Sequence, residues 1–143
     1  MQLHVGDIAP EFSLVDQDDK THSLKDYHGK RVLLYFYPKD DTPGCTREAC
    51  NFRDNIERLQ KKVVVFGVSG DLATSHQRFA KKYSLNFPLL ADPEKKTIAS
   101  YGADGIVLTK RTSFLISPDG KIEKIYPKVN PDAHVEEVLR DVR

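Results

Sequence analysis

Residues 32–50 read VLLYFYPKDDTPGCTREAC, and this stretch decides how the chain folds. Its first six residues form a continuous apolar run, which predicts a strand buried on both faces of a sheet. A polar loop follows, and then Thr42 suits the N-cap of a helix and Pro43 its first helical position. A buried strand therefore leads through a short loop into a helix that carries both cysteines of the chain, Cys45 and Cys50.

That helix is expected to run from residue 43 to about residue 61. Apolar residues recur along it every three or four positions and so form one stripe, made of Cys45, Ala49, Phe52, Ile56 and Leu59. A second buried strand is expected at residues 63–68, immediately after the helix. The order strand, helix, strand at this spacing indicates a crossover between neighbouring parallel strands.

The rest of the chain continues the alternation. An N-terminal β-hairpin arm is expected before residue 30, and further strands at 87–90, 112–117 and 121–126. Helices are expected to open near residue 69, at 94 and at 130, and Pro-Asp-Gly at 118–120 predicts a hairpin turn. We therefore expect one α/β domain over residues 1–143, a thioredoxin-like mixed central sheet flanked by helices on both faces.

Length, charge and hydropathy argue against some classes of function. The chain has 143 residues, with 22 basic and 21 acidic side chains and a formal net charge of +1, so no bulk field favours nucleic acid or a membrane surface. No segment approaches the ~20 apolar residues of a membrane span. No secretory signal is recognisable at the start, so a cytoplasmic location is expected. Thiols are kept reduced there, which favours redox or metal chemistry over a structural disulfide.

Cys45 has the surroundings of a reactive thiolate. It is expected in the first helical turn, where backbone N–H groups lack acceptors and the helix dipole is positive. Thiols at such positions ionise more readily, and the thiolate is the nucleophile. Thr42 can reach the Cys45 backbone N–H or its sulfur, Gly44 leaves room for a small substrate, and Pro38 stiffens the loop.

Cys50 follows Cys45 by five residues, which raises a geometric problem. On an ideal helix this spacing separates the side chains by roughly 140° and the Cα atoms by roughly 8.6 Å. A disulfide needs about 4.4–6.8 Å between Cα atoms. The two cysteines can therefore bond only if the first turns of the helix unwind. On spacing alone, the alternative is that Cys50 is an idle small residue.

The pattern Pro38-x-x-x-Thr42-x-x-Cys45 resembles the active-site signature of peroxiredoxins. The longer string YFYPKDDTPGCTREAC, residues 35–50, closely resembles the Q-type branch, also called bacterioferritin comigratory protein, in which many members place a resolving cysteine five residues after the peroxidatic one. The resemblance covers almost the whole chain and includes the motif RTSFLI at 111–116. It departs between residues 102 and 111, where relatives often carry a longer segment.

This resemblance implies a thioredoxin-dependent thiol peroxidase for hydrogen peroxide and organic hydroperoxides. Cys45 would be the peroxidatic nucleophile and pass through a sulfenic acid. Thr42 and Arg111 would stabilise the reacting peroxide, with Pro38 and Gly44 lining its site. Cys50 would resolve the sulfenic acid as an intrachain disulfide, and thioredoxin or a similar dithiol would reduce it. Neither a cofactor nor a metal is needed, and a monomer suffices.

For the other polar residues the sequence indicates no single function. Glu48 matches a family position that orients the arginine, but it is equally a first-turn residue stabilised by the helix dipole. Asp40 and Asp41 are expected to solvate the loop. The histidines are His4, His22, His28, His76 and His134. They lack ligand spacing, so most are expected at the surface, with His76 packed on a helix stripe.

Two rival functions remain. A thiol–disulfide exchange protein acting on protein disulfides generally uses Cys-x-x-Cys, and the four intervening residues here argue against it. A metal carrier or redox-sensing module needs neither Thr42 nor Arg111, and a soft-metal site would recruit a nearby Met or His. The only methionine is Met1.

Overall fold

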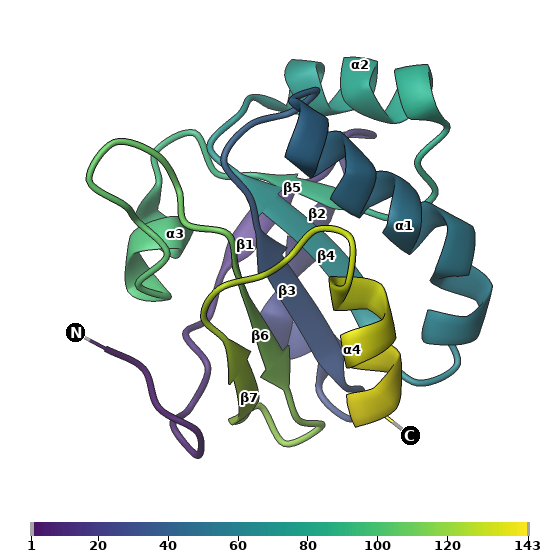
Figure 1. Ribbon diagram of the computed structural model, residues 1–143. Coiled ribbons are helices and arrows are strands. Elements are labelled where there is room, and N and C mark those ends of the chain that lie inside the picture. Colours follow the sequence, from purple (N-terminus) through teal and green to yellow (C-terminus); the bar gives the residue numbers. More distant parts are fainter. Residues whose placement is uncertain (1, 143) are drawn as a thin grey trace.

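The computed structural model describes residues 2–142 and places a five-stranded sheet at the centre of the molecule (Figure 1). The strand order is β5-β4-β3-β6-β7, with β3 in the middle. The strands are β3 Val32–Phe36, β4 Val64–Ser69, β5 Leu89–Ala91, β6 Thr112–Ile116 and β7 Ile122–Tyr126. Strands β3, β4 and β5 run parallel, β6 pairs antiparallel with β3, and β7 pairs antiparallel with β6. The mixed sheet predicted from the strand and helix order is confirmed.

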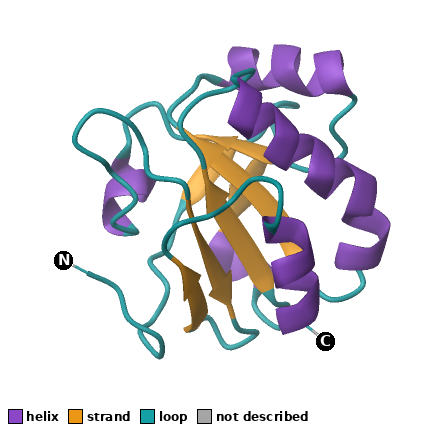
Figure 2. Ribbon diagram, in the orientation of Figure 1, coloured by secondary structure: helices purple, strands orange, loops and turns teal. Residues whose placement is uncertain are grey.

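Helices cover both faces of this sheet (Figure 2). One face packs against α1 Pro43–Leu59, α2 Ala73–Tyr83 and α4 His134–Asp141. The other face packs against α3 Lys96–Ser100 and the N-terminal arm. Strand β3 is buried along its full length, because alternate side chains enter two separate cores. Tyr35 faces α1, for example, and Phe36 faces α3.

The N-terminal arm contains the predicted hairpin. Strands β1 Ser13–Val15 and β2 Thr21–Ser23 pair antiparallel, and the 3₁₀ helix η1 Leu24–Tyr27 follows. Phe12 and Leu24 of this arm are buried against the sheet. The arm thus completes the core on the face where α3 alone would leave part of the sheet uncovered.

Three helices begin later than the sequence pattern indicates. Helix α2 begins at Ala73 and α4 at His134. Helix α3 begins at Lys96 instead of residue 94, because Asp92 holds a turn first: its carbonyl accepts from the N–H of Lys95 at 2.9 Å and its carboxylate from that of Ile98 at 2.8 Å. Asn130 similarly holds a turn before α4, where its side chain accepts from the Asp132 N–H at 2.9 Å.

The prediction that most histidines lie at the surface is wrong. His22, His76 and His134 are at most 4% exposed. Each is buried with polar partners: His22 contacts Asp16 at 2.7 Å, and His134 contacts the Ser113 hydroxyl at 2.8 Å. Burial lowers the pKa of His134, against an opposing effect of Glu137. These are structural histidines whose hydrogen bonds satisfy buried polar groups.

Leu72 is the N-cap residue of α2 and is 61% exposed. Ile106, Val107 and Leu108 are also exposed, in the loop between α3 and β6. Among residues 2–142, no helix is both long enough and apolar enough to cross a membrane.

Candidate active site

Cys45 lies in the first turn of α1, directly beyond the carboxyl end of β3. The helix begins as predicted, with Thr42 as its N-cap residue and Pro43 next. The Thr42 carbonyl accepts from the N–H of Thr46 at 2.8 Å. Cys45 is a free thiol and only 2% exposed. The strand therefore delivers this thiol to the positive end of a 17-residue helix, at the edge of the core.

The Thr42 hydroxyl does not cap the helix. It donates to the carbonyl oxygen of Lys39 at 2.8 Å and makes no side-chain capping bond. The expected reach from this side chain to the Cys45 N–H is therefore not realised here. The bond instead closes the loop between the strand and the helix, because it joins positions three residues apart. Its oxygen keeps lone pairs that can accept another hydrogen bond.

Arg111 approaches Cys45 from the start of β6, the strand next to β3 in the sheet. It directly precedes β6, whose Thr112 is the antiparallel partner of Phe36 at the end of β3. This register places Arg111 beside the loop that leads into α1. Its Nη2 lies 3.3 Å from the sulfur of Cys45, and its Nη1 donates to Oε1 of Glu48 at 3.0 Å. One guanidinium therefore contacts both acidic groups of the first helical turns.

Glu48 is fully buried, with 0% exposure. The alternative interpretation of Glu48 as a first-turn residue stabilised by the helix dipole is wrong, because α1 has no acidic residue in its first turn. The contact with Arg111 favours a role in orienting the arginine. Burial raises the pKa of Glu48 to about 7, although Arg111 acts to lower it. Burial disfavours the charge on Arg111, yet the contacts with Cys45 and Glu48 leave its pKa raised. The charged forms of these groups thus depend on one another.

Gly44 makes the close approach of Arg111 sterically feasible. A Cβ atom at this position would lie 3.1 Å from Nη2 of Arg111 and 3.7 Å from Cγ of Pro131. The first of these distances is shorter than an ordinary van der Waals contact, so a side chain here would displace the guanidinium. Pro38 is half-buried and lies in the loop between β3 and α1.

Cys50 lies in the same uninterrupted helix and is a free, half-buried thiol. The helix is intact over the whole interval from Cys45 to Cys50, so the two cysteines cannot be bonded in this form. Two contacts hold these turns against the segment before α4. Asn51 donates to the carbonyl of Pro131 at 3.1 Å, and Arg47 pairs with Asp132 at 2.9 Å.

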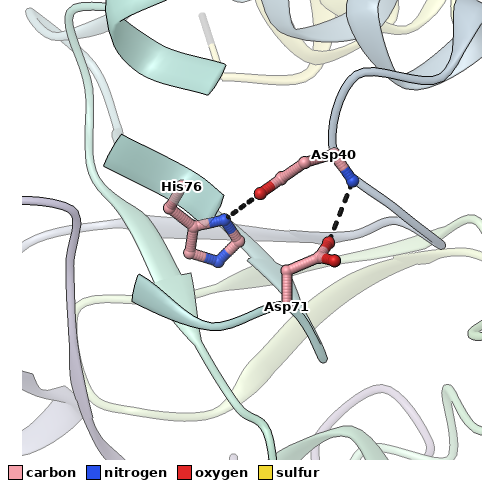
Figure 3. A group of neighbouring side chains, drawn as sticks. All are labelled: Asp40, Asp71 and His76. Carbon is pink, nitrogen blue, oxygen red and sulfur yellow. Dashed lines mark hydrogen bonds and ion pairs between the residues drawn. The ribbon is translucent and has the colours of Figure 1, made fainter. Parts of the chain in front are cut away.

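Asp40 does not solvate the loop as expected, because it is 93% buried and anchors the loop to α2. Figure 3 shows its carboxylate pointing at His76 and its backbone N–H at Asp71, over 2.7 and 2.9 Å. The carboxylate also accepts from the hydroxyls of Tyr37 at 2.6 Å and Ser75 at 2.8 Å. The residues next to Asp40 in the sequence do not indicate this role. The one related signal was the expected packing of His76 on a helix stripe.

Asp40, Asp71 and His76 offer possible metal-ligand atoms within 4.8 Å of one another, so we considered whether they could bind a metal ion. The ring nitrogens of His76 are already engaged, one by Asp40 and the other by the Leu90 carbonyl at 3.0 Å. A metal ion would have to displace these bonds. We therefore interpret Asp40, Asp71 and His76 as a hydrogen-bonded anchor for the loop.

Asp41, next to this anchor, behaves as predicted and stays exposed. It pairs with Lys82 at 2.7 Å and accepts from the Tyr83 hydroxyl at 2.8 Å, and these bonds lower its pKa. Its φ of 59° is the left-handed conformation that Asp adopts more readily than most residues. The two aspartates together tie the loop before Cys45 to both ends of α2.

Comparison with known proteins gives a consistent picture. Residues 5–125 match the AhpC/TSA family. The chain is 46% identical to a putative peroxiredoxin bcp of Coxiella burnetii, over 97% of this chain and 98% of the relative. It is 45% identical to peroxiredoxin Bcp of Escherichia coli, over 96% of this chain and 94% of the relative.

Solved structures agree with these sequences. A mutant of PrxQ from Xylella fastidiosa superposes with a TM-score of 0.92 at 28% identity, covering 99% of this chain and 96% of that one. The bacterioferritin comigratory protein of Xanthomonas campestris gives 0.86 at 28% identity, covering 92% and 89%. The thioredoxin-like fold is therefore confirmed, as is the Q-type resemblance. The chain belongs to the AhpC/TSA family, and within it to the Bcp/peroxiredoxin Q group of peroxidase enzymes.

Proposed function

We propose that this peroxiredoxin reduces hydroperoxides with Cys45 as the peroxidatic nucleophile and Cys50 as the resolving thiol. The contact that carries the proposal is the 3.3 Å approach of Nη2 of Arg111 to the sulfur of Cys45, at the start of α1. A guanidinium and a helix N-terminus both favour the thiolate over the thiol. The Xanthomonas campestris relative is described by its alkyl peroxide reduction activity. We extend that substrate class, with hydrogen peroxide, to this chain.

In the first step the Cys45 thiolate attacks the distal oxygen of the peroxide. The S–O bond forms as the O–O bond breaks, so Cys45 becomes a sulfenic acid and the other oxygen leaves as water or an alcohol. Negative charge moves onto the peroxide oxygens during this step. Arg111 and the backbone N–H groups of Gly44 and Cys45 are the donors placed to stabilise it. The free lone pairs of the Thr42 hydroxyl can accept from the substrate O–H.

In the second step the Cys50 sulfur attacks the sulfenic acid, forming the Cys45–Cys50 disulfide and releasing water. This step requires the first turns of α1 to unwind, because the intact helix keeps the two sulfurs apart. The same opening exposes Cys45, which is otherwise 2% exposed and out of reach of a protein reductant. Local unfolding is thus part of the proposed cycle.

A dithiol reductant closes the cycle through a mixed disulfide, and we propose thioredoxin for this role. Because both cysteines belong to one chain, a monomer is sufficient. The reaction needs no metal or organic cofactor and no nucleic-acid or membrane partner. Its electron supply fits the cytoplasm, where thioredoxin keeps thiols reduced.

Peroxide consumption with thioredoxin, thioredoxin reductase and NADPH tests the proposal. The reduced protein should consume hydrogen peroxide and cumene hydroperoxide over many turnovers, and Cys45→Ser should abolish consumption. The matched control is Thr46→Ser, a conservative change at the next residue of the same turn. A wild-type protein that is no faster than Cys45→Ser would refute the role of Cys45.

A further inference from the structure

One carboxyl oxygen of Glu48 is buried without a hydrogen bond to any residue in the range 2–142. Its Oε1 accepts from Arg111, but Oε2 is buried and has no hydrogen-bond partner among residues 2–142. Buried carboxylates normally have both oxygens hydrogen-bonded, because the charged form is costly to desolvate. A carboxyl with only one partner is better suited to the neutral, protonated form.

The charges around Glu48 point the same way. Arg111 contacts two acidic groups, the Glu48 carboxyl and the Cys45 thiol, at 3.0 and 3.3 Å. Within residues 2–142 it is the only basic side chain that bonds or pairs with Glu48. If both acids were ionised, the buried site would carry a net charge of −1. One guanidinium can compensate the negative charge of either Glu48 or Cys45, but not both charges at once.

The remaining titratable group facing this site is Tyr35, on β3. Its hydroxyl is buried and has no hydrogen-bond partner in the described part of the chain. Burial raises its pKa well above the ordinary value, with further contributions from Glu48, Cys45 and Asp40. Tyr35 is therefore neutral and supplies no charge. Burial raises the pKa of Glu48 to about 7, in agreement with the geometry. Among residues 2–142, Arg111 is thus the one basic side chain that compensates the two acids.

We propose that Glu48 is a positioning residue that shares one proton with Cys45 across Arg111, so that Glu48 is protonated while Cys45 is a thiolate and ionises once Cys45 has reacted. The inference rests on the proposed role of Cys45. Oxidation turns the thiolate into a neutral sulfenic acid, after which Arg111 is free to compensate Glu48 alone. Glu48 then loses its proton as the peroxide's leaving oxygen gains one.

The protons balance without exchange with the solvent. Thiolate, protonated Glu48 and a hydroperoxide become sulfenic acid, ionised Glu48 and an alcohol, with a net charge of −1 on the two side chains together before and after. With a glutamine at this position no stored proton exists, so the leaving oxygen must take one from water. The two cases differ by one proton per Cys45 oxidised.

Infrared difference spectroscopy tests this directly, in the Cys50→Ser background so that the reaction stops at the sulfenic acid. One equivalent of hydrogen peroxide at pH 7 should remove the C=O band of a protonated carboxyl and produce carboxylate bands. Proton uptake, followed with a pH indicator in weak buffer, should be near zero.

The E48Q variant should lack the C=O band and take up about one proton per Cys45 oxidised. The E48D variant keeps a carboxyl, so peroxide should again remove the band. Glu57→Gln, an exposed carboxyl on the same helix, should behave as the parent.

Alkylation of Cys45 with iodoacetamide separates this inference from the peroxidase proposal, because it neutralises the sulfur without peroxide. The same loss of the acid band is expected, now with one proton released. If the band is lost on alkylation but peroxide does not oxidise Cys45, the peroxidase proposal fails and the proton sharing stands. An unchanged carboxyl spectrum on alkylation, measured on a protein whose Cys45 is modified, would overturn the inference whether or not E48Q folds.

Discussion

Nη2 of Arg111 lies 3.3 Å from the sulfur of Cys45, although the two residues are 66 positions apart in the chain. The contact depends on the pairing of β3 with β6, which ends at Phe36 and Thr112. It brings a fixed positive charge to a thiol that already lies at the positive end of α1.

Arg111→Ala should slow the oxidation of Cys45 while the fold stays intact. We expect a loss of about a hundredfold or more, by analogy with removal of one donor from an oxyanion site. Arg111→Lys is the matched comparison: it keeps the charge but cannot hold Glu48 and Cys45 at once, so its rate should fall in between. Single-turnover fluorescence after mixing with hydrogen peroxide measures this step. An unchanged rate in Arg111→Ala would remove Arg111 from the site.

Cys50→Ser should leave the first oxidation of Cys45 intact and block the second step. The protein should stall at the sulfenic acid and, at higher peroxide, advance to the sulfinic acid. Mass spectrometry with a sulfenic-acid trap measures both products, and wild type should show the Cys45–Cys50 disulfide. Sustained turnover of Cys50→Ser with thioredoxin would show that Cys50 is not needed for resolution.

Gly44→Ala should separate stability from activity. Alanine is the better helix former by about 1 kcal/mol, so the melting temperature should stay level or rise. Its Cβ would crowd Nη2 of Arg111 at 3.1 Å and displace the guanidinium, so the oxidation rate should fall by about tenfold. Calorimetry and stopped-flow kinetics on one preparation provide both values. A stable variant with a normal rate would contradict the steric role of Gly44.

Asn51→Ala should speed disulfide formation after Cys45 is oxidised. It removes the bond from Asn51 to the Pro131 carbonyl, which helps to hold α1 next to Cys50 against the segment before α4. A hydrogen bond is worth about 1 kcal/mol net, so opening should become roughly fivefold more frequent. Asn55→Ala is the control, because Asn55 bonds within the helix, to the Asn51 carbonyl. Equal rates in the two variants would exclude the Pro131 contact as a restraint.

The stability of the protein should carry a pH signature from Glu48. Its folded pKa of about 7 exceeds the ordinary value of 4.5, so between these values the folded state binds more protons than the unfolded state. Stability should therefore fall as the pH rises from about 4.5 to about 7 and then level off, by a total of about 3 kcal/mol. Urea unfolding across this range should show a flatter dependence for Glu48→Gln. A wild-type curve that matches the variant would contradict a raised pKa.

Local sequence was sufficient for the elements that the site is built on. The apolar run at residues 32–37, the Thr42–Pro43 boundary and the three-to-four spacing of apolar residues each have a direct backbone consequence. They predicted a buried strand followed by a helix from residue 43, and β3 and α1 are found there. The helix was predicted to about residue 61 and ends at Leu59, a difference ordinary for helix termini.

Burial and pairing of polar side chains depended on tertiary structure. Asp40 reads as a loop carboxylate, but the packing of α2 over the loop encloses it with His76 and Tyr37. Glu48 lies beyond the first turn of α1, and only the position of Arg111 decides which partner it has. His76 is 36 residues from Asp40 and Arg111 is 63 residues from Glu48, so no periodic pattern can encode these two contacts.

Local sequence was enough to predict a cysteine in the first turn of a helix after a buried strand, with a second cysteine five residues later. These features follow from local backbone preferences and from the period of the helix. Only the tertiary structure decided that Cys45 is enclosed, that Arg111 contacts both it and Glu48, and that a single positive charge serves two acids. Such contacts require strands distant in the chain to pair in one register, and the energy of a buried charge depends on what surrounds it.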